Sequence, residues 1–128
     1  MIVAGVGCRA GASALEIEAA IAAALERAGV ASSALGMIAT SSAKGGEPGI
    51  AAAASQRGVR LVVVPQAAFE AAGARAVTRS ERVLALTGVP SVSEAAALAA
   101  CGPDARLIVP RVAVGPATCA LASTEAVS

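Results

Sequence analysis

Short apolar runs alternate with helix-forming stretches along this chain, and that alternation limits the folds open to it. The runs are typical of buried strands and cover residues 2–6, 37–40 and 60–64. Helices are predicted after them, at about residues 13–28, 48–56 and 66–72. A chain in which strands and helices alternate in this way builds a mostly parallel sheet that is covered by helices.

Two helices carry a cap signal at their start. Ser13 with Glu16, and Ser91 with Glu94, have the S-x-x-E spacing of a capping box. In such a box the serine side chain accepts from a backbone N–H, and the glutamate side chain reaches back to the serine N–H. The second box predicts a helix that runs to about residue 100.

The last third of the chain is predicted to close the sheet with a strand pair. Residues 107–109 and 118–122 are the two strands, joined by a turn at residues 114–116. Residues 73–86 are expected to hold a loop and a weak strand near residues 82–86. The fold class is therefore α/β, a three-layer α/β/α sandwich with a mostly parallel mixed sheet of about five strands.

Composition excludes several classes of function. The 128 residues contain no histidine, which excludes histidine acid–base catalysis and histidine metal sites. A net charge of +1 and a single aromatic residue, Phe69, do not suit a nucleic-acid surface. No apolar run approaches the ~20 residues of a membrane span, and the start does not resemble a signal peptide. We expect a single domain over residues 1–128, in a cytoplasmic protein without metal or cofactor.

The loop after the first predicted strand suits an anionic ligand. Gly5 and Gly7 allow close backbone approach, the following helix offers free N–H groups, and Arg9 presents a planar fork. A dinucleotide is the rival ligand, but the G-x-G-x-x-G fingerprint is broken by Ala10, and Thr40 stands where an acid would hold the ribose. A tight turn with a solvated arginine is the plain structural alternative.

The loop after the second predicted strand carries a charged pair. Lys44 is suited to meeting a carboxylate, and Glu47 is the candidate base of the chain. A solvated ion pair at the start of a helix explains the same residues without any chemistry.

A third loop leads into the second capping box. Thr87, Gly88 and Ser91 are candidates for a backbone nest that binds an anion. Glu94 is a candidate beside them, although bonding the backbone at the helix cap is its simpler role.

The three cysteines are widely spaced and form no zinc pattern. Cys101 and Cys119 are expected to be reduced and to pack as small apolar residues. Cys8 differs because Arg9 and a helix start lie close in sequence, and both features lower a thiol pKa. A nucleophile or a soft metal ligand is the less favoured reading of Cys8, since no histidine can act as its base.

Taken together, the loops resemble the cobalamin-biosynthesis family that comprises the stand-alone protein CobE and the C-terminal domain of CbiG. The resemblance spans almost the whole chain in the right order. It rests on Gly5-x-Gly7-Cys8-Arg9, Lys44-x-x-Glu47-x-Gly49, Thr87-Gly88-Val89-x-Ser91-Val92-x-Glu94-x-Ala96, Leu107-Ile-Val-Pro-Arg111 and Thr118-x-Ala120-x-Ala122. The family usually has a lysine where Arg111 stands, which keeps the charge but changes its geometry.

The resemblance implies a role in vitamin B12 synthesis and a tetrapyrrole ligand, a precorrin or a hydrogenobyrinic-type intermediate. Such macrocycles are flat and apolar and carry acetate and propionate carboxylates around the rim, which cationic loops would meet. The site residues expected on this basis are Gly5, Gly7, Cys8, Arg9, Lys44, Thr87, Gly88, Ser91, Glu94 and Arg111.

Three functions remain open at this point. The favoured one is a carrier or accessory protein of the aerobic pathway, which binds a labile intermediate and passes it to other pathway enzymes. The second is a CbiG-type precorrin-5A hydrolase, in which Glu47 activates water to open the ring-contracted lactone and acetaldehyde is released. The third is a nucleotide-binding module unrelated to corrinoids.

Overall fold

A computed structural model describes residues 1–87 and 89–124 of the chain. Five strands form one sheet in the order β3-β2-β1-β5-β4. They are β1 (Ile2–Cys8), β2 (Leu35–Ser41), β3 (Arg60–Val64), β4 (Arg106–Val114) and β5 (Ala117–Ser123). β1, β2 and β3 pair in parallel, whereas β5 is antiparallel to both β1 and β4. Four strands thus point one way, and the predicted mostly parallel mixed sheet is confirmed.

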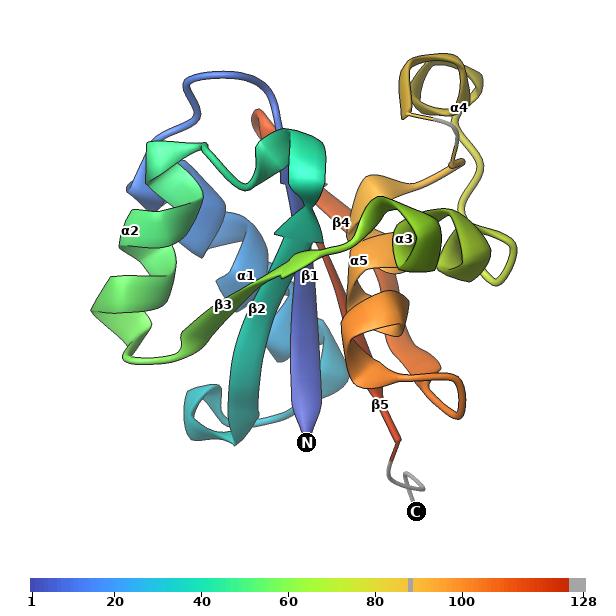
Figure 1. The fold of residues 1–128 in the computed structure, drawn as a ribbon. Coiled ribbons are helices and arrows are strands. Elements are labelled where there is room, and N and C mark those ends of the chain that lie inside the picture. The colour runs from blue at the N-terminus through green and yellow to red at the C-terminus, as the bar shows by residue number, and fades with distance from the viewer. Residues whose placement is uncertain (88, 125–128) are drawn as a thin grey trace.

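Helices cover both faces of the sheet (Figure 1). One face carries α1 (Ala14–Ala28) and α2 (Pro48–Arg57), and the other carries α3 (Gln66–Gly73) and α5 (Val92–Cys101). The short helix α4 (Glu81–Thr87) stands apart, at the end of the sheet where β1, β2 and β3 finish. Two 3-10 turns, η1 (Ser32–Ala34) and η2 (Ser42–Lys44), flank β2. The predicted three-layer α/β/α sandwich is confirmed.

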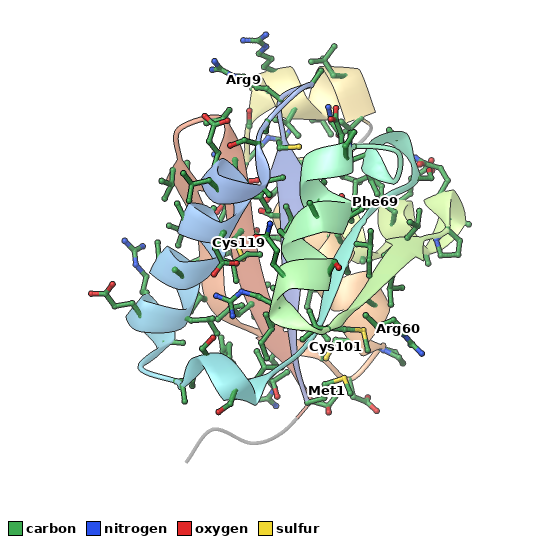
Figure 2. The ribbon with its side chains drawn as sticks, turned by 90° about the vertical axis from the view of Figure 1, so that its left-hand side faces the viewer. Met1, Arg9, Arg60, Phe69, Cys101 and Cys119 are labelled. Atoms are coloured by element: carbon green, nitrogen blue, oxygen red, sulfur yellow. The ribbon has the colours of Figure 1, made fainter. Side chains whose placement is uncertain are left out.

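The core is built from small apolar side chains on both sides of β1. Ala4 and Val6 pack with α1 and α2, whereas Val3 packs with Phe69 and α5. Phe69 and Cys119, one from each side, are 1% and 0% exposed (Figure 2). Because successive side chains of a strand point to opposite faces, a continuous apolar run such as β1 requires cover on both sides.

Gly5 allows α5 to lie directly on the middle of the sheet. A Cβ at this position would be 1.9 Å from the Ser93 carbonyl oxygen and 2.5 Å from the Ala97 nitrogen. No side chain can be fitted at such distances, so the helix reaches the strand only because residue 5 is glycine. Ala95, Ala96 and Ala97 of α5 are fully buried in this contact region.

Most predicted boundaries agree with the structure. The capping box of α1 is present, since Ser13 Oγ accepts from Glu16 N at 3.1 Å and Ser13 N donates to Glu16 Oε1 at 3.0 Å. Gly29 ends α1 in the left-handed conformation, with φ of 69°. The strand pair at the C-terminal end is also as predicted, although β4 is longer than expected and shifts its register between Val109 and Val112.

The weak strand predicted near residues 82–86 is wrong, because this segment is helix α4. Ser80 Oγ accepts from Val83 N at 3.3 Å, which is an N-cap bond. Ser80 followed by Glu81 and other helix formers was the signal in the sequence. The apolar run of residues 83–86 instead suggested a strand, because a run this short cannot be told from a helix by its period.

The second predicted capping box is only half correct. Ser91 Oγ accepts from Glu94 N at 3.4 Å, as expected of an N-cap. The Glu94 side chain does not return to Ser91, because its carboxylate bonds instead to backbone groups of two distant segments.

Within the described residues, no single helix has both the length and the apolarity needed to cross a membrane. Helices α4 and α5 meet that test only as a pair bent by 60°.

Replacement of Gly5 by alanine tests the close contact between α5 and β1. We expect Gly5→Ala to lower the free energy of unfolding by about 3 kcal/mol, since the new methyl group overlaps backbone atoms of α5. Urea denaturation followed by circular dichroism measures this change.

The matched control is Gly46→Ala, because a Cβ at residue 46 meets nothing within 4 Å. That variant should keep the stability of the wild type or gain up to about 1 kcal/mol. Equal stability of the two variants would contradict the packing argument.

Candidate functional site

A cleft with a volume of ≈ 450 Å³ opens at the carboxyl end of β1. Its walls come from the end of β1, from η2, from one side of α4 and from the hairpin that joins β4 to β5. In open α/β sheets, ligands bind beyond the carboxyl ends of the strands, so the position is the expected one. The size lies within the range of sites for small organic ligands.

Four cationic side chains line this cleft: Arg9, Lys44, Arg82 and Arg111. These are four of the ten basic residues of the chain, and none of the acidic side chains that the structure describes joins them in the lining. The chain as a whole has a net charge of only +1, so positive charge is concentrated here. A cleft that is lined by charges of one sign attracts ligands of the opposite charge.

Three of these cations have free hydrogen-bonding capacity. In the part of the chain that the structure describes, the guanidinium groups of Arg9, Arg82 and Arg111 have no hydrogen-bond or ion-pair partner. Lys44 has a distant ion-pair partner, since its Nζ lies 3.9 Å from Glu47 Oε1. Figure 2 shows Arg9 projecting from the end of the molecule, and its backbone N–H donates to the Pro116 carbonyl at 2.9 Å. That bond joins the loop after β1 to the β4–β5 hairpin.

Apolar side chains separate the cations. Val83 and Leu86 come from α4, Val92 from the start of α5, and Ala113 and Pro116 from the hairpin. Leu86 is 74% exposed, so its apolar surface is accessible to a ligand in the cleft. The cleft therefore combines an apolar surface with several separate positive charges.

Gly7 forms the floor of the cleft. A Cβ on residue 7 would be 2.9 Å from Thr118 Oγ1 and 3.3 Å from the Val92 side chain. The Thr118 hydroxyl donates to the Gly7 carbonyl at 3.3 Å. Glycine thus keeps the floor deep and lets α5 and β5 approach each other there.

The structure brings six of the predicted site residues together in the cleft: Gly7, Cys8, Arg9, Lys44, Thr87 and Arg111. The hydroxyl of Thr87 is already engaged, since it donates to the Val83 carbonyl at 2.7 Å and accepts from Val89 N at 3.3 Å. Arg9 and Lys44 meet there because they follow the carboxyl ends of the neighbouring parallel strands β1 and β2.

The other predicted residues lie elsewhere. Gly5 lies under α5, and Ser91 and Glu94 are fully buried within the first turn of that helix. Glu47 lies beside the cleft, where its Oε2 accepts from Gly11 N at 3.2 Å. Gly88 falls outside the described residues.

Cys8 lines the cleft, but the predicted lowering of its thiol pKa is wrong. Burial raises the pKa of the Cys8 thiol, the Glu47 carboxylate raises it further, and Lys44 opposes them. The helix that was expected to lower it begins only at Ala14, six residues further along the chain. At neutral pH Cys8 is therefore a protonated thiol and a weak nucleophile.

Several lining residues were not predicted from the sequence. Arg82, Val83 and Leu86 were missed because α4 was taken for a strand. Thr118 was noted as part of a strand and of a family motif, but not as a site residue. The Ser80 N-cap was the signal for helix α4, but it does not mark Arg82 as a site residue.

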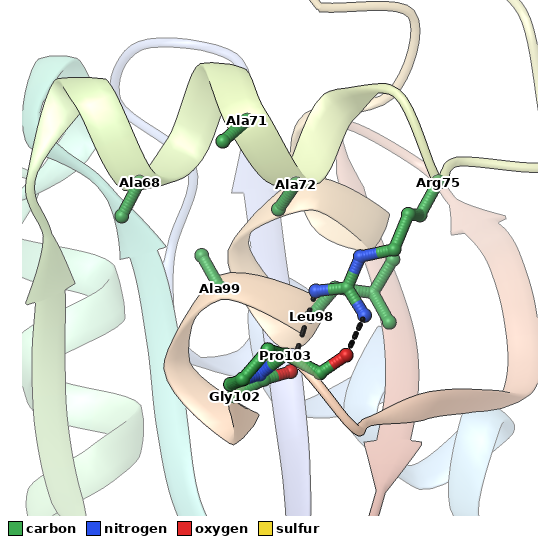
Figure 3. Close-up of a pocket in the computed structure, with 8 residues that line it drawn as sticks. All are labelled: Ala68, Ala71, Ala72, Arg75, Leu98, Ala99, Gly102 and Pro103. Atoms are coloured by element: carbon green, nitrogen blue, oxygen red, sulfur yellow. Dashed lines mark hydrogen bonds between the residues drawn. The ribbon is translucent and has the colours of Figure 1, made fainter.

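In two other cavities among the described residues, the arginine in the lining is already bonded within the protein. One has a volume of ≈ 320 Å³ and lies between α3 and α5, lined by alanines and by Arg75 (Figure 3). Arg75 is committed, since its guanidinium donates to the carbonyls of Gly102, Pro103 and Ala105 at 3.1–3.3 Å. The other is lined by Arg57, whose Nε donates to Glu18 Oε2 at 2.7 Å. The cationic cleft is the best candidate site.

Comparison with known proteins places the chain in a family. The sequence profile of the family described as Cobalamin synthesis G C-terminus matches residues 2–122. The chain belongs to this family. It is thus a member of the CobE/CbiG group of cobalamin biosynthesis, as its motifs predicted.

Individual proteins of cobalamin biosynthesis are also similar to this chain. Protein CobE from Sinorhizobium sp. is 40% identical over 121 residues, which cover 94% of this chain and 79% of that protein. The crystal structure of CobE, a protein from the cobalamin (vitamin B12) biosynthetic pathway, superposes with a TM-score of 0.89 at 31% identity, over 95% of this chain and 89% of that one. Cobalamin biosynthesis protein chiG from Agrobacterium tumefaciens str. C58 gives a TM-score of 0.78 at 44% identity, over 98% and 100%.

Alkylation kinetics test the environment of Cys8. Because the pKa of Cys8 is raised, we expect its reaction with iodoacetamide at pH 8 to be slower than that of a free thiol and to accelerate as the pH rises above 9. Glu47→Gln removes one cause of the raised pKa and should speed the reaction at a fixed pH. Lys44→Gln should slow it.

These rates are measured in a Cys101→Ser background, because Cys101 is also partly accessible, while burial raises the pKa of Cys119 to about 12. Cys8→Ser in the same background gives the blank. A Cys8 rate at pH 8 equal to that of a free thiol would contradict the environment described.

Proposed function

We propose that this protein binds a corrinoid intermediate of cobalamin synthesis in the cationic cleft and holds it for other enzymes of the pathway. The observation that carries the proposal is the gathering of Arg9, Lys44, Arg82 and Arg111 around one cleft without an acidic neighbour in its lining. Membership of the CobE/CbiG family supplies the class of ligand.

The chemistry of the ligand matches the cleft. A precorrin or hydrogenobyrinic-type macrocycle has a flat apolar face and carboxylates on arms around its rim. Separate cations suit separate carboxylates, and arginine forks bind them with two parallel hydrogen bonds. The apolar side chains of Val83, Leu86 and Pro116 offer a surface for the ring.

Binding is better supported than hydrolysis. Glu47, the predicted base, does not line the cleft and already accepts a bond from Gly11 N. Glu94 is fully buried and bonds to three backbone N–H groups, so it is not available to activate water. The chain has no histidine, and Cys8 is a protonated thiol. A carrier needs none of these groups, and a labile intermediate has reason to be shielded.

Spectroscopic titration with a metal-free and a cobalt-containing late precorrin tests the proposal. We expect saturable binding that weakens as the salt concentration rises, because cation–carboxylate pairs are screened. Arg9→Ala, Arg82→Ala and Arg111→Ala should each weaken binding about tenfold, equivalent to about 1.4 kcal/mol per lost charge-assisted contact.

Arg106→Ala is the matched control, since Arg106 is an exposed arginine of β4 outside the cleft. Its affinity should equal that of the wild type. Equal losses in all four variants would mean that only overall charge matters, and absence of binding would refute the proposal.

The mass of the recovered ligand separates a carrier from a hydrolase. We expect the ligand to be released unchanged. Loss of two carbons that is abolished by Glu47→Gln would instead assign the hydrolase activity.

A further inference from the structure

The carboxylate of Glu94 is buried close to the cleft and joins a segment that leads into α4 to the part of β4 that carries Arg111. Glu94 is 0% exposed. Its Oε1 accepts from Val77 N at 2.8 Å and from Thr78 N at 2.9 Å, and its Oε2 accepts from Arg111 N at 2.8 Å. Among the described residues it has no ion-pair partner, and these three backbone N–H groups satisfy both of its oxygens.

The first of these segments leads into α4. Residues 77–78 precede the helix that contributes Arg82, Val83 and Leu86 to the cleft. No residue of α4 is buried, so apolar packing does little to hold it in place. Its N-terminal side is held by the two bonds to Glu94 and by the bond from Ser80 N to the Pro90 carbonyl at 3.1 Å.

The second segment is the irregular part of β4. The register of β4 against β5 shifts between Val109 and Val112, so Pro110 and Arg111 have no paired residue on β5. Pro110 has no N–H, and the N–H of Arg111 turns to Glu94. This bond therefore gives the unpaired N–H of Arg111 an acceptor. It also fixes the backbone that carries the Arg111 side chain into the cleft.

We propose that Glu94 is a positioning residue for ligand binding, in which one buried carboxylate sets the α4 wall and Arg111 at the spacing that a polycarboxylate ligand needs. The proposal rests on the proposed function of the cleft. It assigns to Glu94 an indirect role, since the side chain is enclosed and does not line the cleft.

Glu94→Gln tests this role with a minimal change of shape. A carboxamide has one acceptor oxygen, and its NH₂ group would face a backbone N–H on the other side. The probe is uroporphyrin, a tetrapyrrole with eight carboxylates, titrated by fluorescence at a temperature where every variant is folded. We expect Glu94→Gln to bind it at least about tenfold more weakly than the wild type, equivalent to about 1.4 kcal/mol.

The matched control is Glu18→Gln. Glu18 also bonds through both carboxylate oxygens, to the Arg57 side chain, but between α1 and α2 and away from the cleft. It should lower stability and leave the affinity of the folded protein unchanged. Wild-type affinity in folded Glu94→Gln would overturn the proposal, as would an equal loss in the control.

Amide hydrogen exchange separates this proposal from the proposed function. In the free protein, the amide protons of Val77, Thr78 and Arg111 should be protected in the wild type and should exchange fast in Glu94→Gln, while those of β1 stay protected. If the wild type does not bind uroporphyrin but this exchange pattern is seen, ligand binding fails and the organising role of Glu94 stands. Unchanged exchange would overturn that role.

If Glu94→Gln does not fold, amide exchange in the wild type alone tests the role of Glu94. Val77 is 69% exposed, and an amide in such a loop is protected only if its bond to Glu94 persists. Protection of Val77 and Thr78 close to that of β1 supports the proposal, and fast exchange of these two amides overturns it.

Discussion

The close contact between α5 and β1 at Gly5 is the constraint on which the rest of the structure depends. It requires the absence of a side chain at residue 5, because the Ser93 carbonyl and the Ala97 nitrogen occupy the space that a Cβ would need. The contact places the first turn of α5 deep in the protein, so that Glu94 is fully buried while Val92 reaches the cleft. A buried carboxylate must be satisfied, and the backbone of residues 77–78 and of Arg111 satisfies it. Packing at one glycine therefore has consequences at the site.

The cleft is distinguished by charge and not by size. Two other cavities are present among the described residues, but Arg75 and Arg57 are bonded within the protein there, to carbonyl groups and to Glu18. In the cleft the guanidinium groups of Arg9, Arg82 and Arg111 are directed to no protein partner that the structure describes. Cations held near one another without counter-charges repel, and an anionic ligand relieves that repulsion. The chain belongs to a family of cobalamin synthesis, which is why a corrinoid is the proposed ligand.

Much of the fold follows from local patterns, and much of the site does not. The strands β1, β2 and β3 and the capped helix α1 were predicted because apolar runs, caps and glycine stops act over a few residues. Arg9 and Lys44 were found because they follow strands whose ends meet at one edge. Arg82 was missed because α4 is short and has no fully buried residue, so its sequence carries no strong helical period. The bonds of the Glu94 side chain were predicted wrongly. An S-x-x-E pattern cannot show that a loop and a bulged strand will approach the same carboxylate.

By itself, the sequence determined the alternation of strands and helices, the α/β class and membership of the CobE/CbiG family, since each depends on residue types at short spacing. Only the tertiary structure decided which charges share a cleft, that Glu94 is enclosed and that Cys8 is a protonated thiol. Burial and electrostatic environment are set by neighbours far along the chain, such as Glu47 for Cys8 and Arg111 for Glu94. Local pattern contains no information on such distances, so these properties emerge only when the layers pack.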